Sequence, residues 1–143
     1  MSLILIIGGN SDIGYASAKI FAKNKYDVHL VSRNIEQLNI NKKEIVNLYN
    51  VKCKITCMDL LEQDQINKFF KENTVSPKVI LIASGFLQPE EKKIENIVRI
   101  NYLAPLEFIE KSLDKYQSQE ILKTVIGISS VAGERGKKNN NVY

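Results

Sequence analysis

The sequence has 143 residues, of which 44% are hydrophobic and 25% charged, a composition that excludes disordered and fibrous proteins and is typical of one globular domain. Its net charge of +4 admits a nucleic-acid partner, but the basic residues are scattered except near Lys137 and Lys138, which favours an ordinary solvated surface. One histidine, His29, and two cysteines, Cys53 and Cys57, provide too few ligands for a metal site. The cysteines are typical of buried, reduced thiols in a cytoplasmic protein.

The chain opens with a predicted strand and helix. Residues 3–7, LILII, form a β-branched run closed by two glycines, which predicts a buried strand. This run is too short to span a membrane, and no basic segment precedes it as in a signal peptide. A helix is predicted over residues 12–25, with Asp12 as its N-cap. The predicted buried face of this helix consists of Ile13, Ala16, Ile20 and Phe21.

The rest of the chain continues the alternation of strands and helices. Further strands are predicted over residues 28–31, 51–57, 78–83 and 124–129. The helices between them have apolar residues at helical spacing, namely Leu38, Ile45 and Leu48, then Ile66, Phe69 and Phe70, then Leu106, Ile109, Leu113 and Tyr116. Pro105 predicts a break or a kink in the last helix. This order predicts one doubly wound α/β domain over residues 1–143, with a parallel sheet covered on both faces.

The turn after the first strand, IIGGNSDIGYA, is typical of a phosphate site. Gly8 permits a tight turn, and Gly14 permits close packing of the helix on the sheet. The helix N-terminus behind them offers free backbone N–H groups and the positive end of the helix dipole. A turn between a strand and a helix can also need a glycine for its backbone conformation alone, without any ligand. The position directly after the first strand is what favours a nucleotide.

This turn resembles the TGxxxGIG motif of the short-chain dehydrogenase/reductase family. Ile7 stands in place of the threonine and Asp12 in place of the middle glycine, so the Asp12 carboxylate must turn away from a pyrophosphate. The resemblance implies a Rossmann-like sheet with strand order 3-2-1-4-5 and a dinucleotide bound at the turn. The residues of the turn that would bind it are Gly8, Asn10, Ser11, Asp12, Ile13 and Gly14.

The end of the second strand bears on the choice of cofactor. Folds that bind NAD place an acid there for the ribose 2′-OH, whereas this chain has Ser32 and Arg33. A guanidinium can donate paired hydrogen bonds to a 2′-phosphate, which favours NADP(H) over NAD(H), although Arg33 can also be read as an ordinary surface residue. The resemblance adds adenine contacts from Asp59 and Leu60. It also adds ribose contacts from the segment after the fourth strand, namely Ala83, Ser84 and Gly85.

The last residues match the spacing of the family's catalytic pair. Ser130 ends the fifth strand and Tyr143 follows thirteen positions later, so both are expected at the carboxyl edge of the sheet. Ser129 competes with Ser130, but strand pleating turns it to the other side. Asn101 in RINYLAP matches an asparagine that holds a water in a proton relay; otherwise it is a surface residue or part of a kink.

The resemblance implies hydride transfer between a nicotinamide and a carbonyl or alcohol carbon. Tyr143 would be the general acid/base, Ser130 would hold the substrate oxygen, and Asn101 would support the relay. The family's catalytic lysine, four residues after the tyrosine, and its last strands and helices lie beyond residue 143. The resemblance thus covers about three-fifths of a typical member, and we expect the 143-residue chain to be inactive.

The substrate and partners follow only from the resemblance. The segment SSVAGERG resembles family members that reduce keto-sugars carried on polyprenyl phosphates, which suggests that substrate class. We expect a cytoplasmic homo-oligomer acting on a small carbonyl or alcohol, without nucleic-acid or membrane partners. Two other classes remain open. One is a non-catalytic nucleotide-binding or regulatory module, and the other is an RNA-binding Rossmann-like domain whose affinity would fall steeply with salt.

Overall fold

The computed structural model describes residues 2–86, 94–116 and 120–130. It contains one parallel sheet of five strands in the order β3-β2-β1-β4-β5. The strands are β1 Leu3–Ile7, β2 Asp27–Ser32, β3 Cys53–Cys57, β4 Val79–Ile82 and β5 Thr124–Gly127. The predicted doubly wound sheet and its 3-2-1-4-5 order are confirmed.

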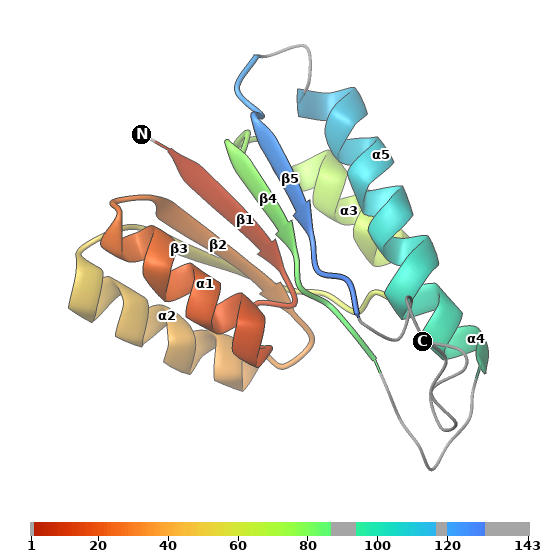
Figure 1. Cartoon of the computed structure of the whole chain (residues 1–143), viewed down its shortest axis with the longest axis horizontal. Helices are drawn as coiled ribbons and strands as arrows, with labels where there is room; N and C mark the ends of the chain where they lie inside the picture. The colour runs from red at the N-terminus through yellow and green to blue at the C-terminus, as the bar shows by residue number, and fades with distance from the viewer. Residues whose placement is uncertain (1, 87–93, 117–119, 131–143) are drawn as a thin grey trace.

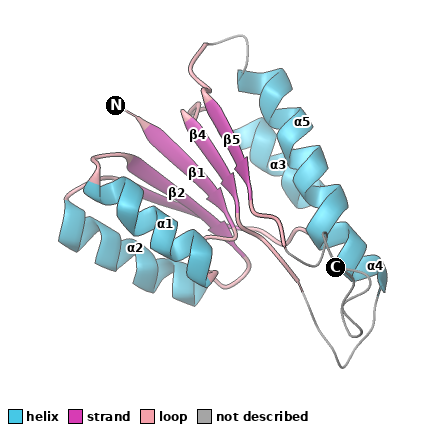
Figure 2. Cartoon of the chain, in the orientation of Figure 1, coloured by secondary structure: helices cyan, strands magenta, loops and turns pink. Residues whose placement is uncertain are grey.

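Helices cover both faces of the sheet. They are α1 Asp12–Lys23, α2 Ile35–Tyr49, α3 Gln63–Glu72, α4 Ile94–Val98 and α5 Ala104–Tyr116. In Figure 1, α1 and α2 lie on one side of the sheet, and α3 and α5 lie on the other. The loops at the carboxyl ends of the strands therefore converge on one edge of the sheet, as Figure 2 shows.

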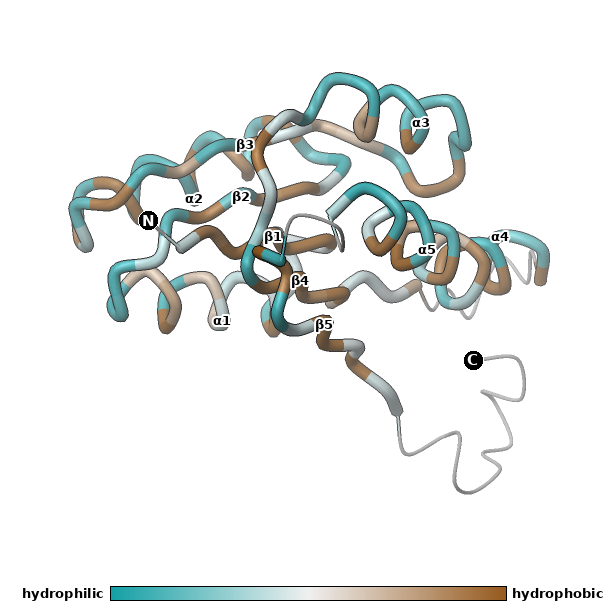
Figure 3. The backbone as a smooth tube through the Cα atoms, turned by 90° about the horizontal axis from the view of Figure 1, so that it is seen from above, coloured by the Kyte–Doolittle hydropathy of each residue, from teal (hydrophilic) through white to brown (hydrophobic). Residues whose placement is uncertain are grey.

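Strand β1 lies at the centre of the core because both of its faces are covered. Leu5 and Ile7 pack with the residues of α3 and α5, whereas Ile4 and Ile6 pack with those of α1 and α2. All four side chains are at most 2% exposed. An unbroken apolar run is what a strand buried on both faces requires. In Figure 3 the tube is hydrophobic along β1 and β4, and hydrophilic over much of α2 and α3.

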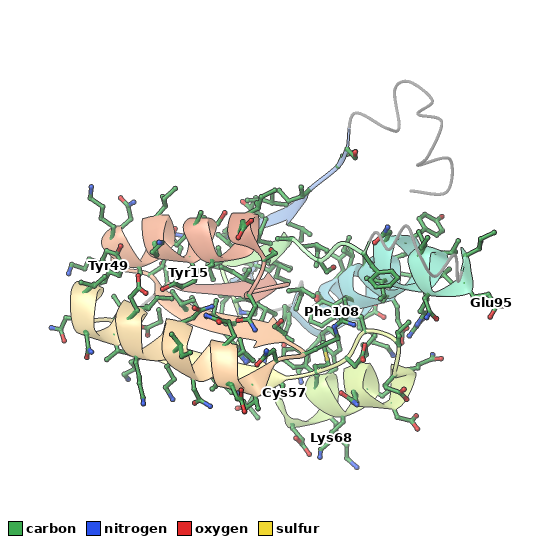
Figure 4. The ribbon with its side chains drawn as sticks, turned by 90° about the horizontal axis from the view of Figure 1, so that it is seen from below. Tyr15, Tyr49, Cys57, Lys68, Glu95 and Phe108 are labelled. Atoms are coloured by element: carbon green, nitrogen blue, oxygen red, sulfur yellow. The ribbon has the colours of Figure 1, made fainter. Side chains whose placement is uncertain are left out.

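An aromatic cluster joins α3 and α5 beneath the sheet. Phe108 of α5 is labelled in Figure 4. Its ring centroid lies 5.3 Å from that of Phe69 and 4.7 Å from that of Phe70. Phe108 and Tyr116 are completely buried. The apolar face predicted for α3, with Ile66, Phe69 and Phe70, is confirmed. The face predicted for α5 is confirmed at Tyr116 but wrong at Leu106 and Leu113, which are exposed; the helix instead buries Ala104, Phe108, Ser112 and Tyr116. Large rings bury much apolar area, so this cluster fixes α5 against the sheet.

The predicted buried face of α1 is wrong. Ile13 and Ile20 are 52% and 62% exposed, and the buried residues are Gly14, Ala18 and Ala22. The helix lies so close to the sheet that only small side chains fit beneath it. A Cβ atom added to Gly14 would lie 2.3 Å from the backbone oxygen of Gly8. The apolar stripe that periodicity detects is therefore the outer one.

The start and end of α1 also differ from the prediction. Asp12 is not the N-cap, because the Oγ atom of Ser11 accepts the bond from the N–H of Gly14 and Asp12 is the first residue of the helix. A hydroxyl one position earlier satisfies the free N–H group, so the carboxylate is not needed for capping. The helix ends at Lys23, two residues early, and Lys25 has a φ angle of 64°.

The predicted interruption of the long helix lies before Pro105. Residues Arg99–Leu103 form a π-helical turn, η1, between α4 and α5, and Pro105 is the second residue of α5. Proline lacks an N–H group and is tolerated in the first turn of a helix, so α5 continues beyond it without a break. A π-helical turn leaves local backbone groups in unusual positions and is frequent at functional sites. Asn101 lies inside this turn.

Strand β5 has an open edge within the described part of the chain, where it pairs only with β4. Its residues Val125 and Ile126 are only partly buried, and Ile128 beyond it is 45% exposed. An apolar edge strand presents unpaired backbone groups to any other chain and can pair with it.

A protein made of these 143 residues alone should therefore associate through β5. We expect dimers or larger species in light scattering at high concentration. Ile128→Lys, which places a charge beside the open edge, should reduce them. A wild-type protein that stays monomeric at high concentration would contradict the prediction that the edge of β5 mediates association.

Candidate functional site

A cavity of about 420 Å³ opens at the carboxyl ends of β1, β2 and β4. Most of the predicted cofactor residues line it: Gly8, Asn10, Ser11, Ser32, Arg33, Asp59, Leu60, Ala83, Ser84 and Gly85. Seven further residues complete the wall: Ile7, Val31, Asn34, Gln37, Met58, Phe86 and Ile100. Cavities at this edge of a parallel sheet are the usual place for a nucleotide.

The glycine-rich turn is held against the neighbouring strands. The N–H groups of Gly8 and Gly9 both donate to the carbonyl of Val31, at 2.9 Å each. Gly8 has a φ angle of 85°, and a Cβ atom there would lie 2.6 Å from the backbone oxygen of Ala83. The turn needs glycine both for this left-handed conformation and for the close approach of the β4 loop.

Ser11 links the turn, the helix and the β4 loop. Its Oγ atom lies 2.7 Å from the carbonyl oxygen of Gly8 and 3.1 Å from that of Ala83, so one hydroxyl proton serves these two acceptors. The same oxygen accepts from the N–H of Gly14 at 3.1 Å. Ser11 is thus a structural link of the cavity wall as well as the helix cap.

Three predicted residues of the turn lie outside the cavity wall, namely Asp12, Ile13 and Gly14. Asp12 and Ile13 are exposed, and Gly14 is buried against Gly8. The Asp12 carboxylate therefore lies outside the cavity, as expected if it turns away from a pyrophosphate. The contribution of these residues is to begin α1 and to let it approach the turn.

The β2 end of the cavity carries its positive charge. Arg33 is exposed and forms no ion pair with any residue of the described ranges. Its carbonyl accepts a hydrogen bond from the Sγ atom of Cys57 at 3.1 Å. In Figure 4, Cys57 lies between the ribbons of α2 and α3. The backbone of the arginine is thus held while the guanidinium stays available to a ligand.

The β3 end of the cavity is ordered by its own loop. Asp59 accepts from the N–H of Leu61 at 3.0 Å through Oδ1, and its own N–H donates to Oε1 of Gln65 at 2.9 Å. Leu60 is 8% exposed and packs into the core. These contacts fix the backbone of the loop at the cavity wall.

The β4 end contains a polar atom without a partner. The Oγ atom of Ser84 is buried and has no hydrogen bond to any described residue, although Ser84 lines the cavity. Buried hydroxyl groups are nearly always satisfied, so this atom is suited to a ligand group. Ala83 and Gly85 lie on either side of it in the wall.

Asn101 is bound to the loop beyond Gly85. Its Oδ1 atom accepts from the N–H of Phe86 at 2.7 Å, and its Nδ2 atom donates to the carbonyl of Phe86 at 2.9 Å. The π-helical turn therefore holds the β4 loop in place through a paired amide contact. Both polar groups of the side chain are used in that contact.

Of the predicted catalytic pair, the described residues include only Ser130, which lies beyond the end of β5 at Gly127 and not at the end of the strand as predicted. Ser130 is partly buried and does not line the cavity. Tyr143 lies outside the described residues, so its pairing with Ser130 stays a prediction.

Sequence reasoning missed the polar residues at the start of α2. Asn34 caps this helix, since its Oδ1 atom accepts from the N–H of Gln37 at 3.0 Å, and both residues line the cavity. An asparagine three positions before a glutamine at a helix start is close to a capping box, which is the signal that could have found them. Phe86 and Ile100 follow no local pattern and appear only once the chain is folded.

The remaining titratable candidates lie away from the cavity. His29 is 1% exposed, its Nε2 atom lies 2.8 Å from Oγ1 of Thr56, and burial lowers its pKa to about 3. Burial raises the pKa of the Cys53 thiol to about 11. Both are therefore neutral core residues. Cys57, by contrast, is exposed, so the prediction that both thiols are buried is wrong for this residue. Within the described ranges, three or more His, Cys, Asp or Glu residues never gather as a metal site would need, and no helix is long and apolar enough to cross a membrane.

Comparisons with known proteins agree with this geometry. A family model described as short chain dehydrogenase matches residues 2–143. The chain is 25% identical to carbonyl reductase family member 4 of Xenopus laevis over an alignment of 147 positions. That alignment covers 96% of this chain and 60% of the relative, so the chain spans about three-fifths of the relative's length.

Two solved structures share the fold. The bulky-bulky ketone specific alcohol dehydrogenase of Comamonas testosteroni superposes with a TM-score of 0.88 at 21% identity, covering 100% of this chain and 60% of the other. A short-chain dehydrogenase of Sphingobium yanoikuyae in complex with NADPH gives 0.84 at 19% identity, covering 100% and 59%. At these identities the likeness concerns the fold.

Three alanine substitutions test the close approach at the turn. Gly8→Ala places a Cβ on a residue with left-handed backbone conformation and brings it against the backbone of Ala83. Gly14→Ala brings a Cβ against the backbone oxygen of Gly8. Each should lower the free energy of unfolding by about 2 kcal/mol or more. Gly127→Ala is the control, because no atom of the described residues lies within 4 Å of its added Cβ. Urea unfolding would measure all three, and equal effects would contradict the close approach.

Proposed function

The chain belongs to the short-chain dehydrogenase family, and on that basis we propose that it forms the cofactor-binding part of an oxidoreductase that uses NADP(H). The observation that carries the proposal is the cavity itself, in which a glycine-rich turn lies beside an arginine that has no ion pair with any described residue. The reaction we propose is hydride transfer between the nicotinamide and a carbonyl or alcohol carbon. The bound cofactor supplies or accepts that hydride.

The residues of the cavity fit a dinucleotide. The turn at Gly8 has no room for a side chain, so the backbone can approach a pyrophosphate directly. The N-terminus of α1 adds the positive end of a helix dipole behind it. At the β4 end, the buried hydroxyl of Ser84 lacks a partner within the described part of the chain and can bind a ribose hydroxyl.

The preference for NADP(H) rests on the β2 end. An enzyme that selects NAD(H) uses an acid there to bind the ribose 2′-OH, and this chain has Ser32 and Arg33 instead. The Arg33 guanidinium has no ionic partner among the described residues and can donate two hydrogen bonds to a 2′-phosphate. A protein of the same fold, from Sphingobium yanoikuyae, holds NADPH.

Two residues carry the proposed chemistry, and a third positions the wall of the site. In the proposed mechanism Tyr143 is the general acid/base that exchanges a proton with the substrate oxygen, and Ser130 donates a hydrogen bond to that oxygen. Asn101 keeps the β4 loop and the helix turn together through its paired contact with Phe86, which positions the cavity wall beside them. A ketone or the matching alcohol is the proposed substrate, and keto-sugars on polyprenyl phosphates are the narrower class suggested by SSVAGERG.

We also propose that the complete protein is a cytoplasmic homo-oligomer. Several large apolar side chains on α4, η1 and α5 are exposed, among them Tyr102 at 62% and Leu106 at 41%. Side chains of this kind on one helix are suited to contact with another protein surface.

Cofactor preference can be measured on a version of the protein that continues past residue 143. We expect NADP(H) to bind more tightly than NAD(H) by about 1.5–3 kcal/mol, since hydrogen bonds to a charged group are worth that much. Arg33→Asp should reverse the order in calorimetry. Lys43→Asp, with the same change of charge on exposed α2 surface, should leave it intact. Equal wild-type affinities for the two cofactors would contradict the proposed preference.

Catalysis should require residues beyond 143. A tyrosine is a weak base at neutral pH unless a nearby positive charge lowers its pKa, and in the family a lysine four residues later supplies that charge. NADPH oxidation with a panel of ketones and keto-sugars should therefore be seen with the longer chain and not with the 143-residue chain. Turnover by the short chain that Tyr143→Phe abolishes would contradict this account. A longer chain without any turnover would favour a non-catalytic nucleotide-binding module.

A further inference from the structure

We propose that Asn41, a buried residue of α2 outside the cavity wall, is a positioning residue that sets the selectivity of the cavity for a 2′-phosphate. The inference rests on the proposed NADP(H) function and extends it to a residue that touches no ligand. Asn41 is 3% exposed and does not line the cavity. It acts through a chain of side-chain amides that ends on the backbone next to Arg33.

The amide chain joins α2 to the glycine-rich turn and returns to the β2 loop. The Nε2 atom of Gln37 donates to Oδ1 of Asn41 at 2.9 Å, and Nδ2 of Asn41 donates to Oδ1 of Asn10 at 3.0 Å. The Nδ2 atom of Asn10 then donates to the backbone carbonyl of Asn34 at 2.9 Å. Residues up to 31 positions apart are thereby connected through three hydrogen bonds in sequence.

The direction of this chain is fixed at one end. A backbone carbonyl can only accept, so Asn10 must present its NH₂ group to Asn34 and its oxygen to Asn41. Asn41 must then donate to Asn10 and accept from Gln37. Because Asn41 is buried, no water can replace a lost bond without cost, and the chain keeps this single orientation.

The backbone oxygens around Arg33 are all engaged, and the amide chain supplies one of these bonds, the one from Asn10 to the carbonyl of Asn34. The carbonyl of Asn34 accepts from Asn10 and from the N–H of Leu38, and that of Arg33 accepts from Cys57. The carbonyl of Ser32 accepts from the N–H of Met58 at 2.9 Å. A carbonyl oxygen that turned toward the cavity would repel a phosphate, and these bonds hold each one in place.

What the same edge offers to a ligand is a set of donors. Gln37 and Asn10 line the cavity, and each NH₂ group keeps a second N–H that no described residue accepts. The guanidinium of Arg33 and the hydroxyl of Ser32 add further donors. An edge with donors and no unengaged carbonyl selects a dianionic phosphate over a ribose hydroxyl, which needs an acceptor as well.

Two substitutions of Asn41 break the chain in different ways. In Asn41→Asp the new carboxylate still accepts from Gln37 but cannot donate to Asn10, so Asn10 must turn its NH₂ group inward and release Asn34. Asn41→Leu has a similar volume, adds no charge, and lies beside Leu38 and Ile45, which are buried on the same helix face. Asn39→Asp is the matched control, since it adds the same charge to exposed surface of α2 two residues away.

The measurement compares two nucleotides that differ by the 2′-phosphate, adenosine 2′,5′-bisphosphate and adenosine 5′-monophosphate. Ligand-observed NMR titrations of the 143-residue chain at low micromolar concentration give a ratio of the two dissociation constants for each variant. We expect the wild type to favour the bisphosphate, and the ratio to fall at least about fivefold in both Asn41 variants, as the loss of one hydrogen bond predicts. Asn39→Asp should keep the wild-type ratio, and thermal unfolding checks that each variant is folded.

A general destabilisation of the fold would weaken the binding of both nucleotides equally and leave the ratio of their dissociation constants unchanged. That result would overturn the role of Asn41. A wild type that favours the bisphosphate, with folded Asn41 variants that favour it equally, overturns this inference and leaves the NADP(H) preference intact. A wild type that binds both nucleotides equally, or neither at millimolar concentration, overturns the proposed cofactor itself. A fall in the ratio for Asn39→Asp as large as for Asn41→Asp would show a charge effect and would also overturn the positioning role.

Discussion

The structure depends on the contact between the glycine-rich turn and the start of α1. Gly14 lies directly against the carbonyl of Gly8, and the hydroxyl of Ser11 bridges the two segments and reaches the β4 loop. Because this contact has no room for a side chain, α1 must present small residues to the sheet. The same closeness brings free backbone groups to the edge where a phosphate can bind. Packing and binding thus have one origin here.

Much of the fold could be predicted because its signals are local. β-Branched runs, glycine turns and helical spacing indicate the elements and their order, and parallel strands follow from that order. The face of α1 could not be predicted, since apolar residues such as Ile20 normally mark the buried side. The short distance between α1 and the sheet leaves room only for small side chains, so Ala18 and Ala22 are buried instead. That distance is a property of the tertiary structure and leaves no local signal in the sequence.

The candidate site divides in the same way. Residues at or just after strand ends, such as Ser32, Arg33 and Ser84, could be predicted to line the cavity. Parallel sheets bind ligands at the carboxyl ends of their strands, whatever the sequence. Asn41 could not, because a polar residue in a helix is usually read as exposed, and its burial depends on partners far away in the sequence. Sequence patterns therefore identify residues that line the cavity more readily than residues that position the cavity wall from behind.

The π-helical turn at Arg99–Leu103 limits the insertions and deletions that this segment can tolerate. A π-helical turn holds one residue more than the α-helical turn it replaces, and one residue rotates a helix by about 100°. Deleting a residue here would straighten the helix but turn either Asn101 away from Phe86 or Phe108 away from the sheet. Insertions and deletions in this segment are therefore constrained from both sides, by the loop contact upstream and by the aromatic core downstream.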